Sequence, residues 1–178
     1  MIYTFLAQGF EECEAFAPVD ILRRAGLNVQ TVGIGSKTIT GSHNITVECD
    51  LLDSEITTEG LEAVILPGGR PGTLNLENNE IVENLINFAA QNNLLIGAIC
   101  AAPSILGHKG LLKDKKATCF TGFEKDLTGA VVVNERAVRD GNIVTAYGAG
   151  AAFDFGFLLL EALKGTDEAE NLKKQMRY

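Results

Sequence analysis

Residues 93–107, NLLIGAICAAPSILG, decide the fold, because an apolar run ends here at a cysteine and continues as a helix-like pattern. The run 94–99 is too short for a buried helix and has the length and apolar character of a central parallel strand. Cys100 follows directly, and Pro103 is typical of the first turn of a helix. The stretch therefore predicts a strand, a sharp turn at Cys100 and a helix.

Small residues flank Cys100 on both sides. Ala98 and Ala102 lie two positions before and after it, which is the spacing of a nucleophile elbow, where a sharp strand-to-helix turn leaves no room for larger side chains. At a helix N-terminus, free backbone N–H groups and the helix dipole favour the thiolate. We therefore expect a reactive thiol that is partly ionised at neutral pH; the alternative is an inert cysteine that only fills space.

Composition narrows the class of protein. A chain of 178 residues, 46% hydrophobic, fits one domain over residues 1–178 with a substantial core. The formal net charge of -8 opposes binding to nucleic acid or to anionic membranes. The N-terminal residues carry no basic leader, and no run reaches the ~18 apolar residues that a membrane-spanning helix needs. We expect a cytoplasmic protein.

Cysteine and histidine spacing predicts no metal site and no cofactor. The four cysteines form no C-x-x-C pair: Cys13, Cys49, Cys100 and Cys119. Neither His43 nor His108 has a carboxylate cluster of ligand spacing near it in the sequence. In a reducing compartment, free thiols are the expected state.

Strand and helix patterns alternate in the first part of the chain. Residues 2–7 and 27–34 are predicted strands, and residues 11–25 are a predicted helix that Pro18 either delays or kinks. Residues 61–66 form another buried strand and end at Pro67-Gly68-Gly69, and residues 79–91 form an amphipathic crossover helix. This βαβ pattern places the loops after residues 66 and 99 at one edge of the sheet.

The other segments carry weaker signals. Residues 38–51 suggest short strands that form an antiparallel annex to the main sheet, and residues 117–120 and 131–133 suggest further short strands. Residues 137–146 predict a hairpin around Asp140-Gly141. Residues 151–163 predict a buried helix capped by Gly165, and the polar tail from Asp167 is helical at best.

Four segments together resemble the ThiJ/PfpI superfamily, in the branch of the Parkinson-associated deglycase and its bacterial relatives. They are GFEECEAFAPVDILRRAG (residues 9–26), VILPGG (64–69), AICAAP (98–103) and the glycine turn at 148–150. The similarity spans nearly the whole chain. It implies a flavodoxin-like three-layer α/β sandwich with a mostly parallel sheet, a cysteine nucleophile elbow and, usually, a homodimer.

The resemblance also implies roles for single residues. Cys100 matches the nucleophile, Glu14 matches the carboxyl group that hydrogen-bonds to it, and the backbone cradle around a bound carbonyl falls on Gly68, Gly69 and Ala101. An ionised carboxylate would repel a thiolate, whereas a protonated one donates a hydrogen bond to it. We therefore expect Glu14 to be neutral.

Three positions depart from the family's pattern. Ala101 stands where the protease-like and chaperone-like branches have a histidine, so peptidase activity is not expected. Phe120 stands where the human-like branch has a histidine near the thiol, and Ala102 replaces the usual glycine. Proton transfer then falls to Glu14 or to water, and we expect a low turnover.

The resemblance implies a cofactor-free glyoxalase or deglycase that acts on small reactive aldehydes such as methylglyoxal or on glycated amines and thiols, with Cys100 adding to the aldehyde and Glu14 moving the proton. A cysteine-based oxidative-stress sensor, or a chaperone-like protein with little turnover, is the main alternative. An interaction protein with an inert cysteine is another. Thiazole monophosphate biosynthesis ranks lowest, because only generic glycine turns offer a phosphate site. Cys119 as a resolving thiol is disfavoured by strand alternation.

Overall fold

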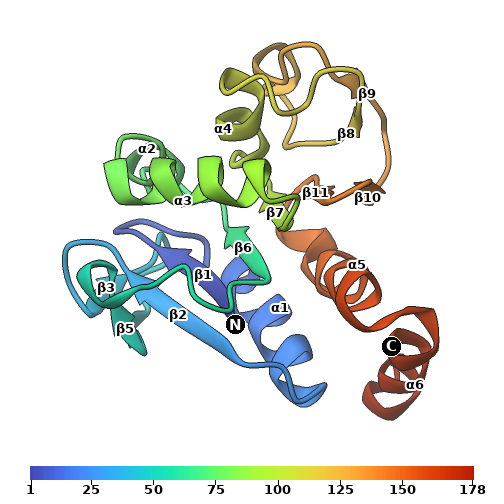
Figure 1. The fold of residues 1–178 in the computed structure, drawn as a ribbon, viewed down its shortest axis with the longest axis horizontal. Coiled ribbons are helices and arrows are strands. Elements are labelled where there is room, and N and C mark those ends of the chain that lie inside the picture. The colour runs from blue at the N-terminus through green and yellow to red at the C-terminus, as the bar shows by residue number, and fades with distance from the viewer.

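A seven-stranded sheet forms the centre of the computed structural model, which describes residues 1–178 (Figure 1). Across the sheet the strands are β10 (Ala137–Asp140), β11 (Ile143–Ala146), β7 (Leu95–Ile99), β6 (Ala63–Leu66), β1 (Ile2–Leu6), β2 (Val29–Gly33) and β5 (Leu51–Leu52). All neighbours are parallel except β10 and β11. The order β2-β1-β6-β7-β11 is that of a doubly wound α/β sheet, so the predicted mostly parallel α/β fold is confirmed.

Helices cover both faces of this sheet (Figure 1). On one face lie α2 (Gly72–Glu77), α3 (Glu80–Gln91) and α4 (Pro103–His108); on the other lie α1 (Glu12–Arg24) and α5 (Ala152–Lys164), with α6 (Thr166–Met176) packed on α5. Strand β7 contributes to both cores, with Ile96 and Ala98 facing one side and Leu95 and Ile99 the other. Burial on both faces is the reason that residues 94–99 are apolar without alternation.

Helix α1 begins at Glu12 although Pro18 lies inside it. The Glu11 carboxylate accepts a hydrogen bond from the backbone N–H of Glu14 at 2.7 Å and caps the first turn. The predicted possibility of a late start is therefore wrong, because this cap offsets the bond that proline removes.

The weaker segments differ in detail from the predictions. The predicted short antiparallel strands within residues 38–51 are confirmed as β3 (Thr38–Thr40) and β4 (Thr46–Glu48), which form a ribbon separate from the main sheet. Strand β5 begins at the end of this segment and joins the main sheet parallel to β2. Strands β8 (Lys116–Ala117) and β9 (Val131–Val132) form a second small ribbon. The predicted β10–β11 hairpin is confirmed, and the tail forms α6. The short helix α2 was not predicted.

Parallel strands bring four loops to one edge of the sheet. These are the loops that follow β1, β6, β7 and β11. They contain Gly68, Gly69, Cys100 and Ala101, and the loop after β1 leads directly into α1, which carries Glu14. No helix in the structure has both the length and the apolar character needed to cross a membrane.

Candidate active site

Cys100 occupies the turn between β7 and α4 with a left-handed backbone, φ 66°. Its N–H donates to the carbonyl of Ala146 in β11 at 2.9 Å, and its own carbonyl accepts from the N–H of Phe120 at 2.8 Å. A left-handed conformation costs a residue with a side chain roughly 1–3 kcal/mol and persists only where the surroundings hold it. The two backbone hydrogen bonds stabilise this conformation, so the position of the half-buried thiol is well defined.

Glu14 lies beside this thiol although it belongs to a different element. The side chain is 1% exposed, and its Oε2 atom accepts a hydrogen bond from the N–H of Gly68 at 2.9 Å. A Cβ atom at Gly68 would lie 2.6 Å from Glu14 Oε2 and 3.1 Å from Cys100 Sγ. Only glycine lets the carboxyl and the sulfur approach each other here, so the structure brings Cys100, Glu14 and Gly68 together as the sequence analysis expected.

The turn after β11 closes the other side of Glu14. A Cβ atom at Gly148 would lie 4.0 Å from Glu14 Oε1 and 3.2 Å from the ring of Phe120. A hydrogen bond from the backbone of Ala149 lowers the pKa of Glu14 and partly opposes the effect of burial. From the sequence alone this turn had no role of its own in the site, although it follows a strand that ends at the same sheet edge as β7, which is the signal that points to it.

The pKa of Glu14 is raised to about 7, mainly by burial, while the hydrogen bond with Cys100 acts in the opposite direction. A carboxyl with this pKa is mostly protonated below neutral pH, which agrees in direction with the expected neutral Glu14. A group with a pKa near 7 can also both accept and return a proton at physiological pH.

The pKa of Cys100 is raised to about 12 by burial and then by the charge and hydrogen bond of Glu14, opposite to the predicted partly ionised thiol. Two features explain the difference: α4 begins three residues after the cysteine and has only six residues, so its dipole is short, and the burial could not be judged from sequence. The hydrogen bond between them lowers the pKa of Glu14 and raises that of Cys100, as expected when the thiol donates to the carboxylate. When Glu14 holds a proton, its repulsion of a thiolate is absent. The two groups therefore titrate as a pair that loses its first proton near pH 7.

Backbone N–H groups of Ala101 and Gly69 hydrogen-bond to the sulfur and lower the pKa of Cys100. These are two of the three residues expected to cradle a bound carbonyl. Gly68 has a different contact, because its N–H donates to Glu14. The site therefore has two N–H donors next to the Cys100 sulfur and, in the Glu14 carboxyl, a group that can carry a proton.

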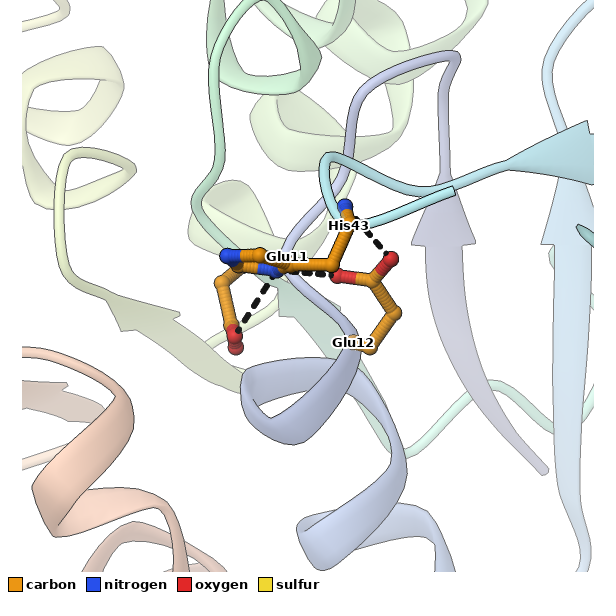
Figure 2. Close-up of side chains that lie close together, drawn as sticks. All are labelled: Glu11, Glu12 and His43. Carbon is orange, nitrogen blue, oxygen red and sulfur yellow. Dashed lines mark hydrogen bonds and ion pairs between the residues drawn. The ribbon is translucent and has the colours of Figure 1, made fainter. Parts of the chain in front are cut away.

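Phe120 occupies the mouth of the site with its side chain exposed. Neither His43 nor His108 lies near the thiol in place of the histidine that Phe120 replaces. His108 ends α4, and its Nδ1 atom lies 2.5 Å from Glu77 Oε1. Figure 2 shows His43 beside Glu11 and Glu12 at the start of α1.

The contacts of His43 correct the expectation that no carboxylates surround the histidines. His43 Nδ1 lies 2.9 Å from Glu12 Oε2 and 3.8 Å from Glu11 Oε1. The ligand atoms of these three side chains lie within 4.8 Å of one another. Both carboxylates, however, already accept hydrogen bonds from the chain: Glu12 from the His43 N–H at 2.8 Å, and Glu11 from the Glu14 N–H at 2.7 Å. The cluster anchors the β3–β4 turn to α1, a contact between distant residues that spacing alone does not reveal.

Several known proteins are similar to this chain in sequence. The sequence pattern of the DJ-1/PfpI family matches residues 1–162. Protein DJ-1 homolog A of Arabidopsis thaliana is 36% identical over 171 residues, which cover 94% of this chain and 44% of that protein. The chain thus spans less than half the length of that relative. A Caenorhabditis elegans protein named glutathione-independent glyoxalase is 26% identical over 167 residues, covering 93% of this chain and 89% of that protein.

Solved structures agree with these sequence matches. The crystal structure of a cysteine-to-alanine mutant of a DJ-1 superfamily protein from Salmonella typhimurium superposes with a TM-score of 0.94 at 33% identity, covering 99% of this chain and 97% of that one. The two chains therefore share one fold over nearly their whole length.

Proposed function

The chain belongs to the DJ-1/PfpI family, and from that membership we propose that it is a cysteine-dependent, cofactor-independent glyoxalase or deglycase for methylglyoxal or glycated amines and thiols. The observation that carries the proposal is the Cys100–Glu14 pair held across Gly68. A relative named as a glutathione-independent glyoxalase supports the choice of reaction.

The first step forms a bond between the Cys100 sulfur and the aldehyde carbon of methylglyoxal. The thiol proton passes by way of Glu14 to the aldehyde oxygen, which gives a hemithioacetal. The N–H groups of Gly69 and Ala101 stabilise the negative charge that develops on this oxygen. This step uses the two donors beside the sulfur and the proton carrier behind it.

The second step moves hydrogen within the adduct. Glu14 removes the proton from the former aldehyde carbon and a proton is returned to the neighbouring carbon, while the hydroxyl proton of the adduct moves to the former ketone oxygen. The aldehyde carbon is thereby oxidised to a thioester carbonyl as the ketone carbon is reduced to an alcohol. Water then hydrolyses the resulting thioester to lactate and regenerates the thiol, and no external oxidant is needed. A pKa of about 7 for Glu14 suits both directions of transfer. For a glycated thiol or amine, the Cys100 sulfur replaces the substrate's sulfur or nitrogen on the hemithioacetal or aminocarbinol carbon. The old C–S or C–N bond breaks, and the freed thiol or amine leaves with the proton of the Cys100 thiol, passed on by Glu14.

Incubation with methylglyoxal in the absence of glutathione, followed by NMR of lactate, tests the proposal. We expect lactate from the wild type and none from Cys100→Ser, while Cys119→Ser serves as the matched control because Cys119 is also a buried free thiol. Lactate from Cys100→Ser would exclude the mechanism. No lactate from a wild type whose Cys100 is readily alkylated would favour the oxidative-stress sensor, for which intact mass after peroxide treatment is the test.

The same proposal includes one domain over residues 1–178 and a homodimer, as the family resemblance implies. Light scattering of the purified chain tests the homodimer by its mass, which should be twice the 19.0 kDa of one chain.

A further inference from the structure

A cavity of about 550 Å³ opens beside the proposed reaction centre. Gly69 and Ala101 line it, and the same two residues supply the N–H groups that face the sulfur of Cys100. Arg70, Ser104 and Phe123 form other parts of the wall. A molecule bonded to the sulfur therefore has room to extend into this cavity.

Arg70 is a charged residue in the wall of this cavity, and it has no role in the proposed reaction steps. It follows Gly69 directly in the chain and is exposed. Its guanidinium makes no ion pair and lies over the ring of Phe123, with Cζ 5.4 Å from the ring centroid. The N–H of Phe123 donates to the carbonyl of Phe120 at 3.1 Å, which ties the ring to the loop at the mouth of the site. The cation is thus supported by an aromatic face but has no anionic partner in the chain.

The other charges of the wall are already paired. Glu77 Oε1 lies 2.5 Å from His108 Nδ1, and Asp126 Oδ1 lies 3.8 Å from His108 Nε2. These two carboxylates raise the pKa of His108 and favour its charged form. Arg70 is therefore the charged group of the cavity that lacks a partner.

We propose that Arg70 binds a carboxylate of the substrate and that the enzyme prefers carbonyl adducts which carry one, such as the adduct of a free amino acid or of a carboxylate-bearing thiol. The planar guanidinium fork matches a carboxylate through two parallel hydrogen bonds. A dianionic phosphate fits less well, because Glu77 and Asp126 line the same wall and the chain carries a net charge of -8. The inference rests on the proposed function for its substrate class, but the position of Arg70 can be tested without turnover.

Alkylation of Cys100 by iodoacetate and iodoacetamide provides that test, because the two reagents differ mainly in a carboxylate against an amide. Peptide mass spectrometry follows each reagent at Cys100. We expect Arg70→Gln to lower the ratio of the iodoacetate rate to the iodoacetamide rate by about tenfold, while the iodoacetamide rate changes little. Arg139→Gln, at an exposed position in β10, makes the same change of net charge and should leave the ratio unchanged. An unchanged ratio in Arg70→Gln would overturn the inference.

Turnover then tests the substrate preference. The methylglyoxal hemithioacetals of N-acetylcysteine and of N-acetylcysteine amide differ only in the carboxylate. We expect the wild type to favour the first, through a lower KM, and Arg70→Gln to lose this preference while its activity on free methylglyoxal remains. Equal use of both adducts by the wild type would overturn the substrate claim. If alkylation depends on Arg70 but no substrate is turned over, the proposed function fails and the carboxylate site stands.

Discussion

Cys100 and Cys119 are both thiols whose pKa is raised to about 12, and burial is the main cause for each. They differ in what surrounds the sulfur. Cys119 follows β8, and the other groups that act on it are the charges of Glu124 and Asp126, which raise its pKa further. Cys100 has a carboxyl group that can hold its proton and two N–H groups that favour its charge.

This difference means that burial alone does not describe how the two thiols exchange their protons. A buried thiol without a proton partner must lose its proton to water at a high pH. The Cys100–Glu14 pair can instead release one proton near pH 7 and keep the other within the pair. In the proposed function, reactivity at neutral pH therefore depends on the pair and not on the cysteine alone, and the following experiments change one member of the pair or of its contrast with Cys119.

Replacing each cysteine by serine should give the largest difference in activity between the two sites. Cys100→Ser should abolish lactate formation from methylglyoxal, because the nucleophile is lost. Cys119→Ser should retain most of the activity, since nothing in the proposed mechanism involves that sulfur. Comparable losses in the two variants would show that the effect at Cys100 is one of folding, which circular dichroism of both would reveal.

Glu14→Gln should remove the proton carrier and keep the shape of the site. We expect kcat to fall by about 10²- to 10⁴-fold, the usual range for loss of a general acid or base. The rise of activity around pH 7 should also disappear, because it belongs to Glu14. A kcat within a few fold of the wild type, with the same pH profile, would mean that water carries the proton and that Cys100 acts alone.

Gly68→Ala should force the pair apart. The added Cβ would lie 2.6 Å from Glu14 Oε2 and 2.7 Å from Cys100 Cβ, and relief of such overlap typically costs about 1–3 kcal/mol of stability. We expect activity to fall by more than tenfold in parallel. Gly150→Ala is the control, because the nearest atom to a Cβ there is 3.9 Å away; thermal denaturation and lactate assays of both variants give the comparison.

The sequence predicted the strand and turn around Cys100 well, since a strand buried on both faces has an apolar run with few alternatives. It also placed Glu14 and Gly68 near the thiol, through the family resemblance. It failed on the pKa of Cys100, because burial depends on parts of the chain that are far away in sequence, such as Glu14 in α1 and Gly68, which lie against the thiol. The contact of His43 with Glu12 was missed for the same reason, as these residues are 31 positions apart.

We expect a smaller effect on the way the free energy of unfolding changes with pH. The pKa of Glu14 rises from 4.5 in the unfolded reference to about 7 in the fold, so the folded state binds this proton more tightly. Its contribution is complete below pH 4.5 and is lost as the pH rises through 7. Between these limits the wild type should lose about 3 kcal/mol relative to Glu14→Gln. Urea unfolding of both proteins across this range measures it; parallel curves would contradict the raised pKa.

The pairing of Cys100 with Glu14 is tested most simply by the rate of alkylation by iodoacetamide at Cys100 and Cys119 from pH 5 to pH 10, followed by peptide mass spectrometry in a single sample. For Cys100 we predict a rise with its midpoint near pH 7 and then a plateau, because above that pH the pair holds one shared proton. Cys119 should remain slow and rise steadily, as expected for a pKa of about 12. A Cys100 profile that rises in parallel with that of Cys119, with no step near pH 7, would contradict the paired thiol.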